Sequence, residues 1–389
     1  MNIQPQINSL VTANHVERAL AVLGDDPNVY GAHDHLLFWL DKGMAAHLAG
    51  RTQVSIDAFE QAEKLNEALY TRSLSQMANT WIVNDRMEDY RGDEQEYVMI
   101  NVFQAFNFAS IGDFDEALVE ARRLDKKLKL IGPRYQNPFA LFLSGLLWHC
   151  STDKDSLTDA LIDYQKAAAA YEAAPRVLSE LMEEAKNNES FKKSGKARVI
   201  VVEYTGFSPV KVADAFPLPL DGNHWTKISF PRYQDRYSEI VFSRVRISRN
   251  GIAHVKETEM VCDLGALAKK ILAGHKGAIM AKATIRPLIK YGVEKAVEVP
   301  VRERAGDLAA DLLGVAGSIY NLATEEADLR TWQSLPNHIR LAYVDLDPGV
   351  YDVTVEDLSD EMVVIDHKTI EKLELSSGQV KFIISRGRF

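Results

Sequence analysis

The sequence predicts an α+β protein with helices in the first half of the chain and strands in most of the second. Three observations lead to this fold class. Apolar residues recur at helical spacing between about 30 and 175, a polar stretch containing Gly195 follows, and a run of β-branched residues begins at Ala197. We therefore expect a helical domain over 1–193 and a β-rich domain, a sheet or sandwich, over 197–389.

The helical half contains one spacing of small and large apolar residues three times. The positions are Trp39, Gly43, Ser55, Phe59 and Ala62, then Ala105, Phe108, Ala117, Ala121 and Leu124, then Gly145, Trp148, Ala160, Tyr164 and Ala167. In a helical hairpin, small residues let two antiparallel helices touch and large ones fill the groove between them. The spacing is that of tetratricopeptide units, so we expect a short repeat stack.

The segments around the repeats complete this half. Helices at about 7–23 and 176–192 are expected to cap the stack, because an end repeat otherwise exposes an apolar face. Between the first two repeats, 64–83 is predicted to be a separate amphipathic helix and 84–96 a polar loop.

The second half alternates β-branched runs with turn residues. Strands are expected at about 197–204, 209–219, 225–230, 239–248, 252–262, 338–345, 349–356, 361–366 and 379–385. Asp347-Pro348-Gly349 is expected to form a turn. A helical insertion is expected at about 264–327, where the apolar spacing returns to a helical period.

The charge is divided unevenly along the 389 residues. Residues 1–195 hold 19 Lys and Arg against 29 Asp and Glu, whereas 196–389 hold 26 of each, so the net charge of −10 lies in the helical half. This acidity argues against a nucleic-acid partner, which needs a concentrated basic surface. There is no apolar run of about 18 residues that would predict a membrane-spanning helix.

The repeat reading predicts a binding groove on the concave face of the paired helices. From their place on the repeat helices, we expect the side chains of Asn101, Gln104, Asn107, Arg122 and Arg123 to face an extended or helical peptide of a protein partner. No bond would be made or broken there.

A basic amphipathic stretch lies between Leu264 and Val297. Its cations include Lys269, Lys270, Lys276, Lys282, Arg286 and Lys290. Such a stretch suits peripheral contact with an anionic membrane or docking on an acidic partner. Two alternatives are an ordinary solvated helix face and a helix that faces the acidic half of the same chain.

Residues of catalytic or metal-binding type occur without a recognisable constellation. His33-Asp34-His35 are interpreted as a cap of the helix that follows, because i, i+2 side chains on a helix diverge. His149 and Cys150 are adjacent and would point apart, and Asp345 and Asp347 fit a turn. No metal, cofactor or catalytic residue is predicted, and Cys150 and Cys262 are too few for a disulfide framework.

Aromatic residues in the second half allow two interpretations. Core packing is favoured for Trp225, Phe230, Tyr233 and Tyr237, with an exposed protein or glycan contact as the alternative. Trp332 is expected to fill the core before the strand at 338.

Several segments resemble a known family. They are Tyr90–Tyr97, Glu120–Arg122, Pro217–Leu220, Glu326–Pro336 and Pro348–Tyr351, and the ADLRTWQSLP stretch is the most specific. Over about 35–385 the chain resembles an uncharacterised bacterial family of tetratricopeptide-containing, lipoprotein-like envelope proteins. The resemblance implies a periplasmic or outer-membrane-associated protein and transfers no catalytic residue. The first ten residues lack a signal sequence and a lipobox cysteine, so a cytoplasmic protein is the alternative.

Together these observations predict a non-catalytic binding and assembly factor of a bacterial envelope complex. One alternative is an enzyme that acts on an envelope polysaccharide or peptidoglycan through the β-rich half. Another is an oligomeric subunit of a ring or secretion-associated assembly.

Overall fold

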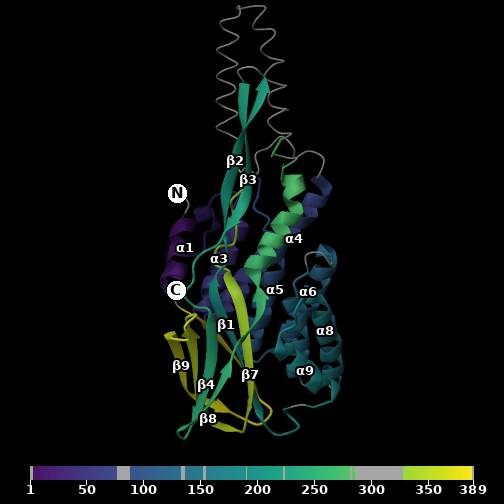
Figure 1. Cartoon of the computed structure of the whole chain (residues 1–389), viewed down its shortest axis with the longest axis vertical. Coiled ribbons are helices and arrows are strands. Elements are labelled where there is room, and N and C mark those ends of the chain that lie inside the picture. The colour runs from purple at the N-terminus through teal and green to yellow at the C-terminus, as the bar shows by residue number, and fades with distance from the viewer. Residues whose placement is uncertain are drawn as a thin grey trace, which may run out of the picture.

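The structure, a computed structural model, describes residues 3–76, 88–132, 136–151, 155–189, 191–221, 224–280, 283–284 and 327–387. Helices occupy the first half of the chain and strands the second, as the sequence predicts (Figure 1). Within these ranges no helix is long and apolar enough to cross a bilayer.

The helices of the first half pack as consecutive pairs. They are α1 (Gln4–Thr12), α2 (Val16–Leu23), the 3-10 turn η1 (Pro27–Tyr30), α3 (His35–Leu48), α4 (Thr52–Gln76), α5 (Glu94–Ile111), α6 (Phe114–Ile131), α7 (Pro138–Cys150), α8 (Ser156–Ala170) and α9 (Arg176–Lys186). Within the pairs α3 lies against α4, α5 against α6 and α7 against α8. Gly112 ends α5 in the left-handed region, and Asp113 Oδ1 then accepts a bond from Glu116 N and caps α6.

The helix expected over 7–23 is two helices, α1 and α2, and α9 ends at Lys186, before the expected end at 192. Two boundaries expected between the first two repeats are also wrong. Residues 52–76 form the single helix α4, because nothing in that sequence, neither Gly nor Pro, interrupts it at Lys64. The polar loop expected over 84–96 ends early, because α5 already begins at Glu94. Residues 77–87 lie outside the described residues.

Glycines stand where paired helices touch. A Cβ built on Gly43 would lie 2.6 Å from the Phe59 ring, and one built on Gly145 would lie 2.5 Å from the Tyr164 ring. These are two of the small-against-large contacts that the repeat spacing predicts. A larger side chain at either position would push the two helices apart.

The strands form two four-stranded sheets and a two-stranded ribbon. They are β1 (Ala197–Phe207), β2 (Val210–Asp221), β3 (His224–Gln234), β4 (Phe242–Arg249), β5 (Ile252–Glu257), β6 (Glu259–Asp263), β7 (Pro336–Leu346), β8 (Gly349–Leu358), β9 (Val364–Leu375) and β10 (Val380–Arg386). The first sheet has the order β10-β1-β7-β6 and the second β5-β4-β8-β9, and β2 pairs with β3 in the ribbon. Figure 1 shows the ribbon extending away from both sheets.

Strand β1 lies at the centre of the molecule and is buried at every residue. Ile200 and Val202 belong to the core between the helices and the first sheet. Val199 and Val201 belong to the core between the two sheets. A strand that is buried on both faces usually has a continuous run of apolar residues, and the sequence of β1 has this pattern.

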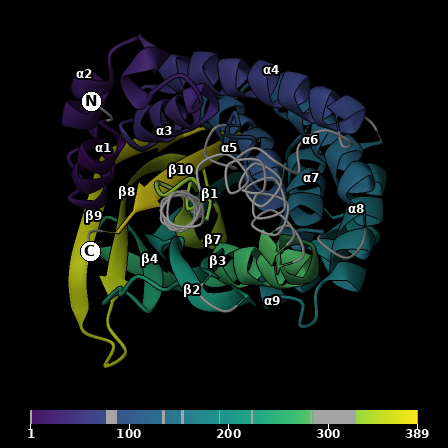
Figure 2. The same cartoon turned by 90° about the horizontal axis from the view of Figure 1, so that it is seen from above.

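The helices curve around the first sheet, which lies on the inner side of their arc (Figure 2). The largest core joins residues from Ile7 to Phe382 and includes rings from both halves. The expected boundary at 193–197 therefore marks the change from helix to strand, but the two halves do not have separate cores.

Candidate functional site

A polar cleft of the described chain lies where the helical half meets the ribbon. We call it the junction cleft. Its volume is about 600 Å³, and it is lined by residues 88–94, by Lys211 and Pro231 of the ribbon, by the helix over 264–280 and by residues 327–330. A larger hollow of about 980 Å³ lies between α6–α8 and β6, but its paired charges are mostly exposed and so contribute little.

An ion pair in the junction cleft joins α5 to the ribbon. Asp93, the residue before α5, accepts from Lys211 Nζ at 2.8 Å and from the Tyr233 hydroxyl at 2.7 Å. Burial alone would raise the pKa of Asp93, but the charge of Lys211 and these hydrogen bonds outweigh it and lower the pKa. Lys211 and Tyr233 are cross-strand partners, so β2–β3 pairing positions both donors.

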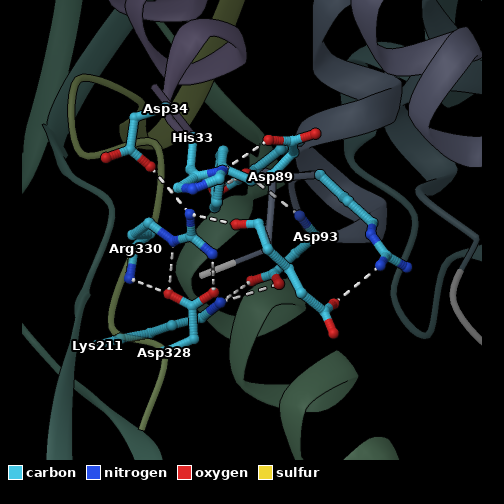
Figure 3. A network of polar contacts seen from close by, with 11 residues as sticks. His33, Asp34, Asp89, Asp93, Lys211, Asp328 and Arg330 are labelled. Atoms are coloured by element: carbon cyan, nitrogen blue, oxygen red, sulfur yellow. Dashed lines mark hydrogen bonds and ion pairs between the residues drawn. The ribbon is translucent and has the colours of Figure 1, made fainter. Parts of the chain in front are cut away.

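Arg330 ties three segments together. Its guanidinium donates to Asp34 Oδ1 at 3.0 Å, to the carbonyl of Glu88 at 3.0 Å and to Asp328 Oδ2 at 2.7 Å (Figure 3). The side chain is 11% exposed. Burial acts against the charge, but the ion pairs with Asp328 and Asp34 raise the pKa of Arg330, so it stays cationic.

The cap predicted from His33-Asp34-His35 is only partly formed. Asp34 occupies the N-cap position of α3, but its side chain makes no capping bond, because its carboxylate pairs with Arg330. His33 Nδ1 lies 2.9 Å from Asp89 Oδ1, and His35 contacts Asn28. The three residues point to different partners, as the i, i+2 argument predicts.

Every carboxylate in the described lining of the junction cleft has a basic partner. Glu88 pairs with Arg91, Asp89 with His33, Asp93 with Lys211, Glu94 with His275 at 2.6 Å, and Asp328 with Arg330. These bonds come from α5, the ribbon, the helix over 264–280 and the segment before β7. The pairs of Lys211 with Asp93 and of Arg330 with Asp34 join separate segments through cations that are 8% and 11% exposed, and these two pairs hold the cleft in shape.

A second, fully buried group of acids lies behind the cleft. Glu96 accepts from the Tyr90 hydroxyl, from Thr331 Oγ1 at 3.0 Å and from Trp332 N at 2.8 Å. Burial and the charge of Asp93 raise the pKa of Glu96.

Asp41 of α3 plays the same joining role. It accepts from the Tyr30 hydroxyl at 3.0 Å and from Ser334 Oγ at 2.6 Å. Burial raises its pKa to about 7. The described segment 327–335 is thus bonded to the helical half over most of its length.

Three of the five predicted partner-binding residues are buried, and the prediction is wrong for them. Asn101 donates to Glu120 Oε2 at 2.6 Å, Gln104 to the carbonyl of Ile56 at 3.3 Å, and Asn107 to Ser55 Oγ at 2.8 Å. The physical reason is that α5 contacts α3, α4, α6, α7 and β10, so its polar side chains bond inside the chain. The concave face holds the protein's own sheet.

The other two, Arg122 and Arg123, lie exposed on α6. Arg123 donates to Glu120 at 2.8 Å, and the Arg122 guanidinium lies 5.6 Å from the centre of the Trp148 ring. Neither lines the junction cleft, and the five residues do not meet in one site.

The basic stretch is described only in part. Lys269 pairs with Asp235 at the end of β3, and Lys270 lies 3.8 Å from Glu172 of the helical half. The Lys270 contact fits the alternative that this helix faces the acidic half. Lys276 lies exposed on the same helix. The remaining predicted cations, Lys282, Arg286 and Lys290, lie outside the described residues.

The other candidates for chemistry, the two cysteines and Asp345, have structural roles. Burial raises the pKa of Cys150 and of Cys262 to about 12, so both thiols stay protonated. Asp345 pairs with Arg198 at 2.7 Å, and β8 begins at Gly349 after the predicted turn. Among the described ranges no group of three or more His, Cys, Asp or Glu side chains is placed to hold a metal ion.

The core packing predicted for the aromatic residues is found at some positions and not at others. Trp332 is buried against Phe59 and Phe103, as expected. Trp225 and Tyr237 are 53% and 85% exposed, so the favoured core packing is wrong for them. Trp225 is exposed because the ribbon stands away from both sheets, where strand residues have no layer to pack on.

Sequence reasoning missed the residues that organise the cleft. Arg330 lies in the ADLRTWQSLP stretch, whose resemblance assigns the arginine no role, and no motif in the sequence marks Lys211. Comparison of the chain with protein-family models, with curated proteins and with solved structures gave no match.

Proposed function

We propose that this protein is a non-catalytic binding and assembly factor, and that its partner binds in the junction cleft. One observation carries the proposal: the cleft is built from distant segments whose charged side chains are cross-linked into a fixed shape. Recognition sites work best when rigid elements hold their contact groups in place beforehand.

The finer identity of the helical half is part of this proposal. We take its three hairpins as tetratricopeptide units, and the contacts of Gly43 with Phe59 and Gly145 with Tyr164 support that assignment. The resemblance of the ADLRTWQSLP stretch supports an envelope location in a bacterium. The concave face of the repeats is occupied by the first sheet, which leaves no room there for a peptide (Figure 2). We therefore place the partner site in the junction cleft.

The charge of the cleft favours a basic partner segment. Its lining holds five carboxylates against Arg91, Lys211, Arg330 and the imidazole of His275. Asp89, Glu94 and Asp328 keep 42%, 31% and 29% of their side chains exposed, so they can accept further donors. A Lys or Arg side chain that enters the cleft would form charge-assisted hydrogen bonds with them.

The same pairing supports a non-catalytic role over the polysaccharide-hydrolase alternative. Glycoside hydrolysis needs one carboxyl group that keeps its proton and a second that is ionised across the sugar. Lys211 lowers the pKa of Asp93 in the cleft, whereas the neighbouring acid with a raised pKa, Glu96, is buried behind the cleft, where a sugar cannot reach it.

The test is site-specific photocrosslinking in the native cell, with the crosslinking residue at position 91. Arg91 lines the cleft and its side chain is 42% exposed. We expect one discrete crosslinked protein, which is lost when Asp89→Asn and Glu94→Gln are combined.

A matched control removes two acids elsewhere. Asp360→Asn with Glu361→Gln on the exposed β8–β9 turn should leave the crosslink at position 91 intact, and a crosslinker at position 361 should not capture the same protein. Capture that is equal from both positions contradicts the proposed site. Release of soluble fragments from purified cell-wall polysaccharide, abolished by the cleft variants, would support the enzyme instead.

A further inference from the structure

A second, smaller cavity adjoins the junction cleft. We call it the side groove. It lies between the helix over 264–280 and the ribbon and has a volume of about 290 Å³. Leu272, Ile279 and Pro231 line both cavities and therefore form the wall between them.

The interior of the side groove is apolar. Its walls are Phe230, Pro231, Leu272, Ala273, Ile279 and Met280. The only side-chain hydroxyl in the described lining belongs to Tyr233, and it is already bonded to Asp93. A peptide in this groove would lose hydration of its backbone amides without finding partners, which costs free energy. A plain hydrocarbon chain has no such groups.

The rim of the groove is cationic. Lys269, Lys276 and Arg232 stand there against one acid, Asp214. Asp214 accepts a bond from Ala215 N, and Lys269 pairs with Asp235. Lys276 and Arg232 are exposed and have no acidic partner in the described part of the chain. The two are free to bind an anionic head group.

The size of the groove limits what can enter. Small-molecule sites in proteins span roughly 300–1,000 Å³, so a volume of about 290 Å³ stands at the lower end. An α-helix with its side chains is about 10–12 Å across and needs a wider groove. One hydrocarbon chain fits these dimensions better than a helix or a two-chain lipid.

We propose that the side groove binds a fatty-acid-like amphiphile, with one acyl chain against Phe230, Leu272 and Met280 and its carboxylate at Lys276 and Arg232. This goes beyond the function proposed above, because the ligand and the cavity differ and neither Lys276 nor Arg232 lines the junction cleft. No covalent step is involved.

The test is calorimetric titration of the purified full chain with laurate below its micelle concentration. We expect one molecule bound per chain. Lys276→Gln should weaken binding by about tenfold, the effect of losing one charged contact. Ala273→Leu should abolish binding, because Ala273 is exposed on a helix and a larger side chain there fills the groove without disturbing the core.

Two controls test whether laurate binding depends on the side groove or only on positive charge near it. Lys270→Gln removes a cation from the same helix outside the groove and should leave laurate binding unchanged. Dodecyltrimethylammonium has a comparable chain with a cationic head and should not bind.

Three outcomes would overturn the proposal. They are equal binding of both amphiphiles, laurate binding that survives Ala273→Leu, and binding only to phosphatidylglycerol vesicles with no effect of Ala273→Leu. The last would assign the cations to a membrane surface. The crosslinking experiment at position 91 does not depend on laurate binding. If the side groove does not bind laurate, the proposed partner site in the junction cleft is unaffected.

Discussion

Glu96 Oε1 accepts a hydrogen bond from the backbone N–H of Trp332 at 2.8 Å, across 236 positions of the chain. The same carboxylate accepts from Tyr90, Thr331 and Asp93 N, the last being half of a capping box at the start of α5. One side chain thus begins a helix and also fixes the segment that leads into β7.

Glu96→Ala is therefore expected to destabilise the whole protein by about 3 kcal/mol or more, because several buried donors lose their acceptor at once. Urea unfolding followed by circular dichroism measures it. Glu183→Ala, an exposed acid on α9, should change the free energy of unfolding by no more than about 0.5 kcal/mol. Equal effects of the two variants would show that the Glu96 bonds are not coupled to the fold.

Replacing a helical glycine by alanine is expected to lower the free energy of unfolding at one site and to raise it at another. Gly145→Ala should destabilise by about 1–3 kcal/mol, because its Cβ would meet the Tyr164 ring at 2.5 Å and the Ala160 carbonyl at 3.1 Å. Gly277→Ala should stabilise by about 0.5–1 kcal/mol, since it lies in a helix with nothing within 4 Å of its Cβ. Thermal unfolding compares them. A stabilising Gly145→Ala would contradict close helix packing in this hairpin.

The hairpins could be predicted from sequence because their information is local. Gly43 and Phe59, or Gly145 and Tyr164, lie within one helical pair, and their spacing repeats. Most strands were predictable for the same reason, since β-branched runs and turn residues mark them one at a time. The single strand expected over 252–262 is wrong, because β5 and β6 belong to different sheets, and β9 continues to Leu375, past the expected end at 366. The position of the ribbon relative to the helices has no such local signal.

The site could not be predicted, because its contacts span the chain. Lys211 meets Asp93 across 118 positions, and Arg330 meets Asp34 across 296. Asn101 and Asn107 looked suited to a groove because polar residues on a repeat helix often face solvent. Here both bond to other helices of the same half, Asn101 to Glu120 and Asn107 to Ser55, and the concave face is covered by the first sheet (Figure 2).

Buried acids predict a dependence of stability on pH. The pKa of Asp41 rises from 3.8 to about 7 on folding, chiefly through burial. Between pH 4 and 7 the native state therefore holds more protons than the unfolded state, and the free energy of unfolding falls as pH rises. Asp41 alone should contribute a slope on the order of 1 kcal/mol per pH unit. Asp357, whose pKa also rises to about 7, adds a slope of the same sign.

Asp41→Asn removes this titrating group. Its amide oxygen can still accept from Ser334 Oγ, and its NH2 group, in place of Oδ2, can donate to the Tyr30 hydroxyl oxygen. We expect urea unfolding at pH 4, 5.5 and 7 to show a flatter pH dependence than the unaltered protein. Asp360→Asn, at an exposed turn, should follow the unaltered protein in parallel. A slope that persists in Asp41→Asn would assign the whole effect to other acids.

The shared core predicts that the two halves fold only together. Phe103 of α5 lies 5.8 Å from the ring of Tyr204 and 5.7 Å from that of Trp332, both from the second half. A fragment of 1–193 would leave this side of α5 exposed to water, and one of 197–389 would expose one face of β1. We expect each fragment alone to lack cooperative thermal unfolding and the co-expressed pair to regain it. If 1–193 alone unfolds as sharply as the full chain, the helices are an independent domain.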